Sequence, residues 1–174
     1  MNEYVIQGIG FIGVVLFVVS YQIKSNRALF LCQLLGCIVF STQFFIMGAY
    51  TGALSLMVNI IRNVLLLLSK NRTWARSKLA LCAILLLLTV VTVYTWAGWT
   101  SLLPSFSVAV TTLGYWTQNA QKIRLSQLIG SPCALAYDVV IRSWGGVMNE
   151  SIVLLSILVS ILRFGWKNLA DETS

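Results

Sequence analysis

Histidine is absent from this sequence of 174 residues, and acidic residues are rare, since Asp and Glu together number five. The four cysteines, Cys32, Cys37, Cys82 and Cys133, lie inside apolar runs and show no metal-ligand spacing. Such cysteines are typical of small packing residues rather than of disulfides or metal ligands. The sequence also has no Gly-rich phosphate loop and no nucleophile beside a base. We therefore expect neither an enzyme nor a bound cofactor or metal.

Charged residues are scarce as well. They make up 10% of the chain against 58% hydrophobic residues, and the mean hydropathy is +0.85. So little polar surface cannot cover a water-soluble globule, and the lipid bilayer is expected to be the main solvent. The net charge of +7 comes from short clusters between apolar runs, which indicates a topology signal and no binding of nucleic acid. No cation precedes the first apolar run, so a cleaved signal peptide is not expected.

Seven apolar stretches are long enough to cross a bilayer as helices, which takes about 20 residues within a range of roughly 17–25. These runs are continuous rather than alternating, which favours helices over a barrel. The sequence therefore predicts an all-α integral membrane protein with seven transmembrane helices. The predicted spans are residues 4–21, 28–47, 52–69, 79–97, 102–118, 123–143 and 147–164.

Most of the cations stand at alternate ends of these spans, and those ends are predicted to be cytoplasmic. Ten of the twelve Lys and Arg residues follow this pattern: Lys24, Arg27, Lys70, Arg72, Arg76, Lys78, Lys122, Arg124, Arg163 and Lys167. The connections 48–51 and 98–101, at the opposite ends, carry no charge. The pattern predicts a multi-pass protein with its N-terminus outside the cell and its C-terminus in the cytoplasm.

Two stretches that lie 94 positions apart read alike without a gap. The matches are Tyr21 with Tyr115, Leu31 with Leu125, Gln33-Leu34 with Gln127-Leu128, Gly36 with Gly130, and Gly52 with Gly146. Because three is odd, two repeats of three spans face the same way only if an additional helix joins them. We therefore predict two parallel three-helix bundles joined by a linker helix (3+1+3), related by a pseudo-twofold axis along the membrane normal. The predicted parts are residues 1–70 for the first bundle, 71–101 for a basic loop and the linker helix, 102–166 for the second bundle, and 167–174 for a cytoplasmic tail.

Arg62, flanked by Asn59 and Asn63, is the main candidate for a solute site. It lies roughly 15 Å along its span from Gly52, at 1.5 Å per helical residue, which places it near the bilayer midplane. Polar groups inside a membrane are costly and mark function by default, so these three side chains are expected to bind solute. The alternative is structural: Arg62 snorkels to the cytoplasmic headgroups or braces neighbouring carbonyls.

Two pairs of equivalent positions in the repeats contain glutamine, and they are interpreted differently. Gln33 and Gln127 match between the repeats, each three residues before a glycine, and are expected to serve helix packing. Gln43 has Tyr137 as its counterpart, so this polar position differs between the repeats. Asymmetric polar positions are better candidates for recognition, and Gln43 and Tyr137 are therefore predicted to bind solute.

Gates are expected at the two ends of the solute site. Asp138 and Arg142, four residues apart, can form an ion pair along one helix face, and Glu150 can join them or sit at a helix N-terminus. These three residues are interpreted either as an outer gate or as a structural pair with a capping acid. The cytoplasmic ends of the first helix in each repeat are expected to form an inner gate or an interfacial anchor from Tyr21, Gln22 and Tyr115.

Several segments together resemble the YgjV-type family of bacterial inner-membrane proteins. They are Gln43–Tyr50 running into Gly52, Asn59–Arg62, Leu102-Leu103-Pro104, and Trp144–Glu150. That family is similar to the superfamily of SWEET sugar carriers, PQ-loop proteins and nicotinamide-riboside-type vitamin transporters. The resemblance implies the bacterial inner membrane, the arrangement of two three-helix bundles, and transport of a small solute. The PQ-loop proline is missing, because Tyr21-Gln22 stands there and the membrane-embedded proline is Pro132, so a proline hinge in the first helix is not implied.

Together these observations predict a transporter that moves a small polar solute, such as a sugar or a vitamin, by alternating access. Facilitated diffusion is favoured because no pair of midplane carboxylates offers a proton or sodium site, although Asp138 keeps ion coupling open. The alternative is a non-transporting receptor or scaffold with a protein partner, since relatives of this architecture include sorting receptors. A homo-oligomer is left open.

Overall fold

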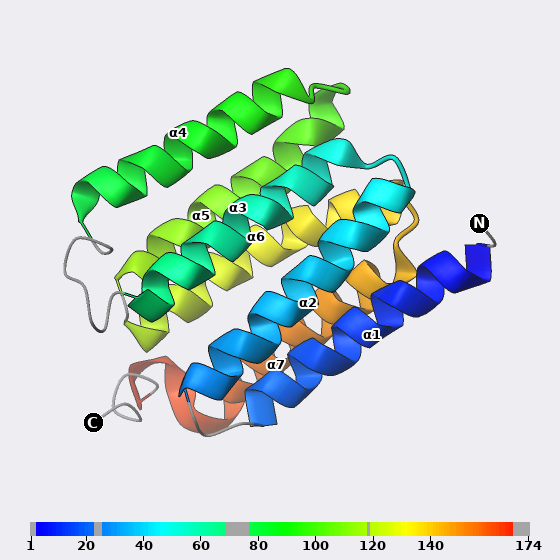
Figure 1. Cartoon of the computed structure of the whole chain (residues 1–174). Coiled ribbons are helices and arrows are strands. Elements are labelled where there is room, and N and C mark those ends of the chain that lie inside the picture. The colour runs from blue at the N-terminus through cyan, green and yellow to red at the C-terminus, as the bar shows by residue number, and fades with distance from the viewer. Residues whose placement is uncertain (1–2, 23–25, 69–76, 118, 169–174) are drawn as a thin grey trace.

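The computed structural model describes residues 3–22, 26–68, 77–117 and 119–168, and side chains at 20–22, 26–30, 120, 160 and 163–168 are outside this description. Within these limits the chain is all-helical and has seven α-helices, which confirms the predicted all-α class and the number of helices (Figure 1). They are α1 (Glu3–Gln22), α2 (Asn26–Ile46), α3 (Tyr50–Leu68), α4 (Lys78–Tyr94), α5 (Leu102–Trp116), α6 (Ala120–Val140) and α7 (Trp144–Asn168). A short 3₁₀ helix, η2 (Trp99–Ser101), leads into α5.

Six of these helices pack as a closed ring in the order α1, α2, α3, α5, α6, α7 and back to α1. The helix left out is α4, which packs mainly on the outside of α3 and α5 (Figure 1). The helices α1–α3 form one half of the ring, here called the first half, and α5–α7 form the second half. The halves meet along two seams, one between α3 and α5 and the other between α1 and α7.

The second helix of each half ends with the same hydrogen-bond pattern. After α2, Gly48 adopts φ 75° and the Ala49 amide donates to the Phe44 carbonyl at 2.9 Å. After α6, Arg142 adopts φ 58° and Ser143 donates to the Asp138 carbonyl, also at 2.9 Å. Both are Schellman-type ends, in which a left-handed residue stops the helix. The prediction that the sixth helix runs to residue 143 was therefore wrong, because α6 ends at Val140.

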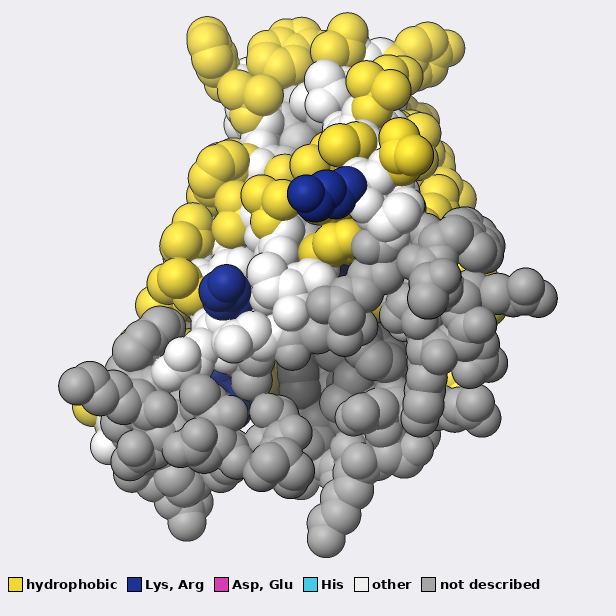
Figure 2. Space-filling model, turned by 90° about the vertical axis from the view of Figure 1, so that its left-hand side faces the viewer, with side chains coloured by type: hydrophobic (Ala, Val, Ile, Leu, Met, Phe, Trp, Pro, Cys, Tyr) yellow, Lys and Arg dark blue, Asp and Glu magenta, His cyan; other side chains and the backbone are white. Residues whose placement is uncertain are grey.

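Apolar side chains cover much of the described part of the face drawn in Figure 2. Many of the buried side chains, by contrast, are polar. Leu79, Leu86, Val93 and Leu162 are between 68% and 85% exposed, whereas polar side chains such as Gln43 are fully buried. Water-soluble monomers rarely show extended apolar surface of this kind, so the pattern favours a lipid environment.

Length and composition identify one described helix, α3, as able to cross a membrane. Shorter apolar stretches occur in four further helices, at Glu3–Val19, Leu31–Ile46, Lys78–Tyr94 and Trp144–Val159. The crossing of the membrane by all seven helices, and the side on which each chain end lies, stay predictions.

Candidate functional site

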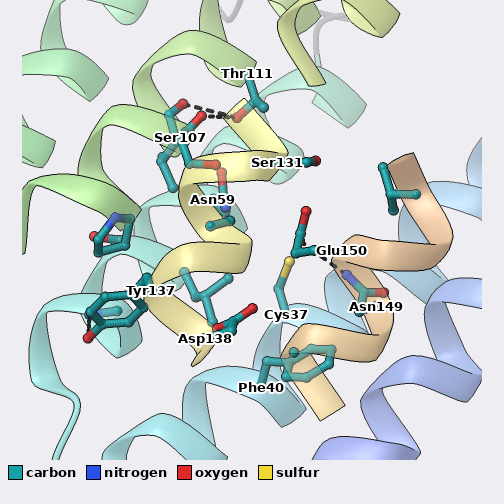
Figure 3. Close-up of a pocket in the computed structure, with 18 of the residues that line it drawn as sticks. Cys37, Phe40, Asn59, Ser107, Thr111, Ser131, Tyr137, Asp138, Asn149 and Glu150 are labelled. Carbon is teal, nitrogen blue, oxygen red and sulfur yellow. Dashed lines mark hydrogen bonds between the residues drawn. The ribbon is translucent and has the colours of Figure 1, made fainter. Parts of the chain in front are cut away.

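A cavity of about 150 Å³ lies inside the ring of six helices (Figure 3). Every ring helix contributes to its wall, from Phe17 on α1 to Val153 on α7. Among the described residues, α4 contributes none. The cavity therefore belongs to the two halves together and is the candidate functional site.

Residues that line the cavity recur at the spacing of 94 positions found in the sequence. Of the eleven lining residues in the first half, nine have a counterpart in the second half that also lines the cavity. The pairs are Phe17 and Thr111, Gln33 and Gln127, Cys37 and Ser131, Phe40 and Ala134, Phe44 and Asp138, Gly52 and Gly146, Ser55 and Asn149, Leu56 and Glu150, and Asn59 and Val153. The two halves thus present equivalent backbone positions to one space, although the side chains at these positions differ.

Arg62 connects the two halves across the seam between α3 and α5. Its Nη1 donates to Thr111 Oγ1 at 3.3 Å and to Thr112 Oγ1 at 3.4 Å. Its Nε and Nη2 donate to Asn63 Oδ1 on its own helix at 3.3 and 3.2 Å. The guanidinium also lies over the ring of Tyr115, with Cζ 4.6 Å from the ring centroid, which is within cation–π range. Arg62 is 6% exposed and braces the hydroxyl groups and ring of α5, so the snorkelling alternative does not describe its position.

The other two predicted ligands on α3, Asn59 and Asn63, line the same cavity as Arg62. Asn63 is occupied by its bonds from Arg62, whereas Asn59 Oδ1 is buried without a hydrogen-bond partner in the described part of the chain. One turn before Asn59, the buried hydroxyl of Ser55 also has no partner there. Buried polar atoms are nearly always hydrogen-bonded, so these two point to water or a ligand in the cavity.

Asp138 and Glu150 line the cavity from α6 and α7, and both point into it in Figure 3. Asp138 is 6% exposed and packs so closely on Gly146 that an added Cβ there would lie 2.5 Å from its carboxyl carbon. Glu150 accepts a hydrogen bond from Asn149 Nδ2 at 3.3 Å. These two carboxylates therefore line one cavity, while the absence of a proton or sodium site formed by a pair of midplane carboxylates stays a prediction.

The predicted ion pair between Asp138 and Arg142 is not formed within the described chain. Arg142 lies in the left-handed turn after α6 and is exposed, so it no longer shares a helix face with Asp138. Its carbonyl accepts a hydrogen bond from Gln7 Nε2 at 2.8 Å, and Gln7 Oε1 accepts one from the Trp144 amide at 3.1 Å. Arg142 thus belongs to the turn between α6 and α7, outside the cavity.

The two asymmetric candidates occupy different places. Tyr137 lines the cavity, and its hydroxyl accepts a hydrogen bond from the Gly52 amide at 3.1 Å. It also lines a second pocket, between the turn after α2 and η2, so its ring separates the two spaces. Gln43, by contrast, is fully buried outside the cavity wall, packed on Gly10 and bonded by Ser143 Oγ at 3.4 Å. The structure therefore does not support Gln43 as a ligand.

Tyr115 is the predicted inner-gate residue whose side chain is described. Its ring lies under Arg62, and its hydroxyl accepts a hydrogen bond from Gln127 Nε2 at 2.9 Å. The helix α1 ends at Gln22 as expected, but the side chains of Tyr21 and Gln22 lie outside the described residues. One predicted gate residue and one predicted ligand are thus in direct contact near the ends of α5 and α3.

Some cavity residues escaped the sequence analysis, among them Ser55, Ser107, Ser131 and Asn149. Hydroxyl side chains are common in apolar helices, where they bond to the carbonyl four residues earlier, and they carry little signal on their own. Gln33 and Gln127, interpreted as packing residues, also line the cavity. The spacing of 94 positions, applied to Ser55, would have identified Asn149.

Comparison with known proteins gives one match. The sequence model of a family described as "Imp-YgjV: Bacterial inner membrane protein" matches residues 4–168, nearly the whole chain. No curated protein matches the chain, and no solved structure does.

Proposed function

Since this chain belongs to the Imp-YgjV family of bacterial inner membrane proteins, we propose that it carries a small polar solute across that membrane by alternating access. The solute occupies the central cavity and moves down its own gradient. The two halves of the ring act as parallel three-helix bundles, joined by α4, with the N-terminus outside and the C-terminus in the cytoplasm. Binding at the interface of two repeats, followed by rocking of one against the other, is the common plan of such carriers.

The observation that carries this proposal is the lining of one cavity by equivalent positions of both halves. A pseudo-twofold axis that relates α1 to α5 and α3 to α7 also relates the two seams, because the contact of α3 with α5 becomes that of α7 with α1. A site on such an axis opens to either side through equivalent movements of the halves. The exclusion of α4 from the cavity wall agrees with a role as linker.

The two seams differ in a way that suits rocking. At the seam of α1 with α7, backbone meets backbone, since a Cβ at Gly145 would lie 2.7 Å from the Gly10 carbonyl carbon. At the seam of α3 with α5, Arg62 holds Thr111 and Thr112 through bonds of 3.3 and 3.4 Å. Side-chain hydrogen bonds can be exchanged for bonds to water or solute, whereas a backbone contact stays in place, so the Arg62 cluster with Tyr115 serves as the inner gate and the glycine contact as the pivot.

Cys37 provides a test that needs no knowledge of the solute, because its side chain lines the cavity. The protein would keep Cys37 while Cys32, Cys82 and Cys133 are replaced by serine, and a charged, membrane-impermeant thiol reagent would be added to one side of sealed vesicles. Alternating access predicts labelling from both sides, in right-side-out and in inverted vesicles. The matched control keeps only Cys82, which is exposed on α4 away from the cavity and is expected to stay unlabelled in lipid.

Labelling of Cys37 from one side only would contradict alternating access. That result would favour the second interpretation, a receptor or scaffold with a static pocket. A membrane-embedded protein of that kind needs a protein partner rather than flux of a solute.

A further inference from the structure

Two of the three acidic residues that the structure describes line its cavity. Of the five in the sequence, Glu3 begins α1, and Asp171 and Glu172 lie beyond the described residues. The other two, Asp138 and Glu150, both line the cavity (Figure 3). Carboxylates are rare in this chain, so two that face one buried cavity indicate that the function of the cavity needs them.

These two carboxylates have little compensation from the protein. Among the described residues, the Asp138 side chain has no hydrogen bond and no ion pair, and Glu150 has hydrogen bonds from Ser131 and Asn149 but no ion pair. Arg62, the one cation among the described residues of the cavity wall, bonds to Asn63, Thr111 and Thr112 and to neither acid. A buried carboxylate without a partner is strongly unfavourable, so its charge is removed by a proton or balanced by a cation from outside the chain.

Several hydrogen-bond donors of the cavity wall are already engaged by neighbouring side chains. Arg62 already donates four bonds, and Asn149 Nδ2 and Gln127 Nε2 each donate to a neighbouring side chain. Among the described residues that line the cavity, the buried side-chain atoms without a partner are Asn59 Oδ1 and the hydroxyl of Ser55, both on α3. Together with the two carboxylates, they call for a ligand that donates hydrogen bonds and carries positive charge.

Aromatic rings complete this environment. Phe40, Phe44 and Tyr137 line the cavity, and successive rings in this row have centroids 6.3 and 6.2 Å apart in edge arrangements. Aromatic rings beside carboxylates form an environment that attracts ammonium groups, which bind over ring faces. Arg62 disfavours a second positive charge at the far end, and it favours an oxygen atom there as an acceptor.

We propose that the transported solute is a small monoamine that binds as its ammonium cation between Asp138 and Glu150, with an oxygen acceptor at its other end. This proposal rests on the carrier function proposed above and names the substrate class of the same cavity. A volume of about 150 Å³ suits a metabolite of a few heavy atoms rather than a peptide. The inside-negative membrane potential then draws the cation inward without ion coupling.

Thermal unfolding of the detergent-purified full chain tests this with four probes of nearly equal size. In mildly acidic buffer, ethanolamine has the proposed chemistry, ethylene glycol is neutral, glycolate is an anion, and 1,2-diaminoethane, with both amines protonated, is a dication. At a concentration about a hundred times its Kd, ethanolamine is expected to raise the unfolding midpoint by about 5 °C, because a ligand that binds the folded state stabilises it. The other three probes, and sodium chloride at equal ionic strength, are expected to leave the midpoint unchanged.

Two variants and a control place the effect at the cavity. Asp138→Asn and Glu150→Gln keep the shape of each side chain and remove its charge, and they are expected to abolish the ethanolamine shift. Without ligand, Asp138→Asn is expected to unfold at a higher temperature than wild type, because a buried charge without a partner has been removed; a structural carboxylate predicts the opposite. Glu3→Gln, at the exposed start of α1, is expected to respond to ethanolamine as wild type does.

The contrary results separate the two proposals. A shift with glycolate, a sugar or sodium but none with ethanolamine would overturn the ammonium class, while labelling of Cys37 from both sides would keep the carrier. No shift with any probe, together with a lower midpoint for Asp138→Asn, would assign the carboxylate to structure and overturn the proposal. An ethanolamine shift that persists in both cavity variants would place the binding elsewhere and overturn it as well.

Discussion

The two halves of this molecule present the same backbone positions to the cavity and very different side chains. Phe44 and Leu56 in the first half correspond to Asp138 and Glu150 in the second, at a spacing of 94 residues. Conversely, Arg62 supplies a charge to the cavity from the first half, whereas its counterpart in the second half, Ser156, is exposed on the outside of α7. The first half therefore supplies the cation and most of the aromatic rings, and the second supplies both acids. The shared backbone geometry suits an alternating movement, and the differing side chains suit recognition of a polar solute in one orientation.

The comparison extends to the starts of α3 and α7, where Gly52 and Gly146 are counterparts. Their amides belong to the first turn of a helix and have no acceptor within it. Gly146 donates to Ser143 Oγ at 3.3 Å, just before its own helix. The counterpart of Ser143 is Ala49, which has no side-chain acceptor, and Gly52 instead donates to Tyr137 of the other half at 3.1 Å. The first half thus depends on the second for a helix cap.

Exchange of a residue for its counterpart tests this comparison, and Arg62→Ser is expected to have the largest effect. The change removes the bonds from Arg62 to Thr111 and Thr112 and its contact with Tyr115. Bonds to a charged group contribute about 1.5–3 kcal/mol each, and they partly offset the burial of the charge, so a loss of about 3 kcal/mol is expected together with loss of solute flux. Thermal unfolding and vesicle uptake measure the two effects. Arg62→Lys is the control, and equal stability of wild type and Arg62→Ser would contradict the bracing role.

Gly145→Thr, which copies Thr51 into the second half, is expected to rank next. Its side chain would collide with the backbone of Gly10, since even a Cβ would lie 2.7 Å from the Gly10 carbonyl carbon. Overpacking of this kind lowers the free energy of unfolding by about 1–3 kcal/mol, and it prevents the close helix contact that forms the proposed pivot. Gly8→Ala is the matched control, because a Cβ at Gly8 meets nothing within 4 Å and alanine favours a helix. Similar unfolding midpoints for the two variants would show that the glycine contact is not close in solution.

Tyr137→Phe is expected to cost about 1 kcal/mol, because the Gly52 amide loses its acceptor. Ala49→Ser copies Ser143 and gives α3 a cap of its own, so the double variant is expected to recover most of the loss. Unfolding midpoints of wild type, both single variants and the double variant form a complete cycle. Additive effects in that cycle would mean that Tyr137 and position 49 do not serve the same amide.

Arg142→Gly is expected to have the smallest effect, and the effect is stabilising. It copies Gly48, which occupies the equivalent left-handed position after α2. A left-handed conformation costs a residue with a side chain roughly 1 kcal/mol relative to glycine, so the unfolding midpoint is expected to rise by a few degrees. Arg142→Ala removes the charge and keeps the strain, which separates the two causes. A rise with alanine as large as with glycine would assign the effect to charge.

The sequence was most informative where a regular pattern repeats along a helix. The apolar runs predicted all seven helices, and the four-residue spacing of Asn59 and Asn63 around Arg62 correctly placed all three on one wall. The prediction failed where a local hydrogen-bond pattern decides the outcome. The pairing of Asp138 with Arg142 assumed a helix through residue 143, but the left-handed turn at Arg142 ends α6 at Val140 and carries the arginine away. The prediction for Gln43 failed because spacing in the sequence does not show that this side chain packs on Gly10, outside the cavity wall.

The position of α4 outside the ring has a consequence for assembly. Two separate three-helix units that meet only along two seams would have to find each other by diffusion in the bilayer. A covalent tether replaces that encounter by an intramolecular one, with an effective concentration on the order of millimolar. Such a tether needs the right length and direction, and little else is required of its side chains. We therefore expect the sequence of α4 to tolerate exchange for another apolar helix far better than any helix of the ring.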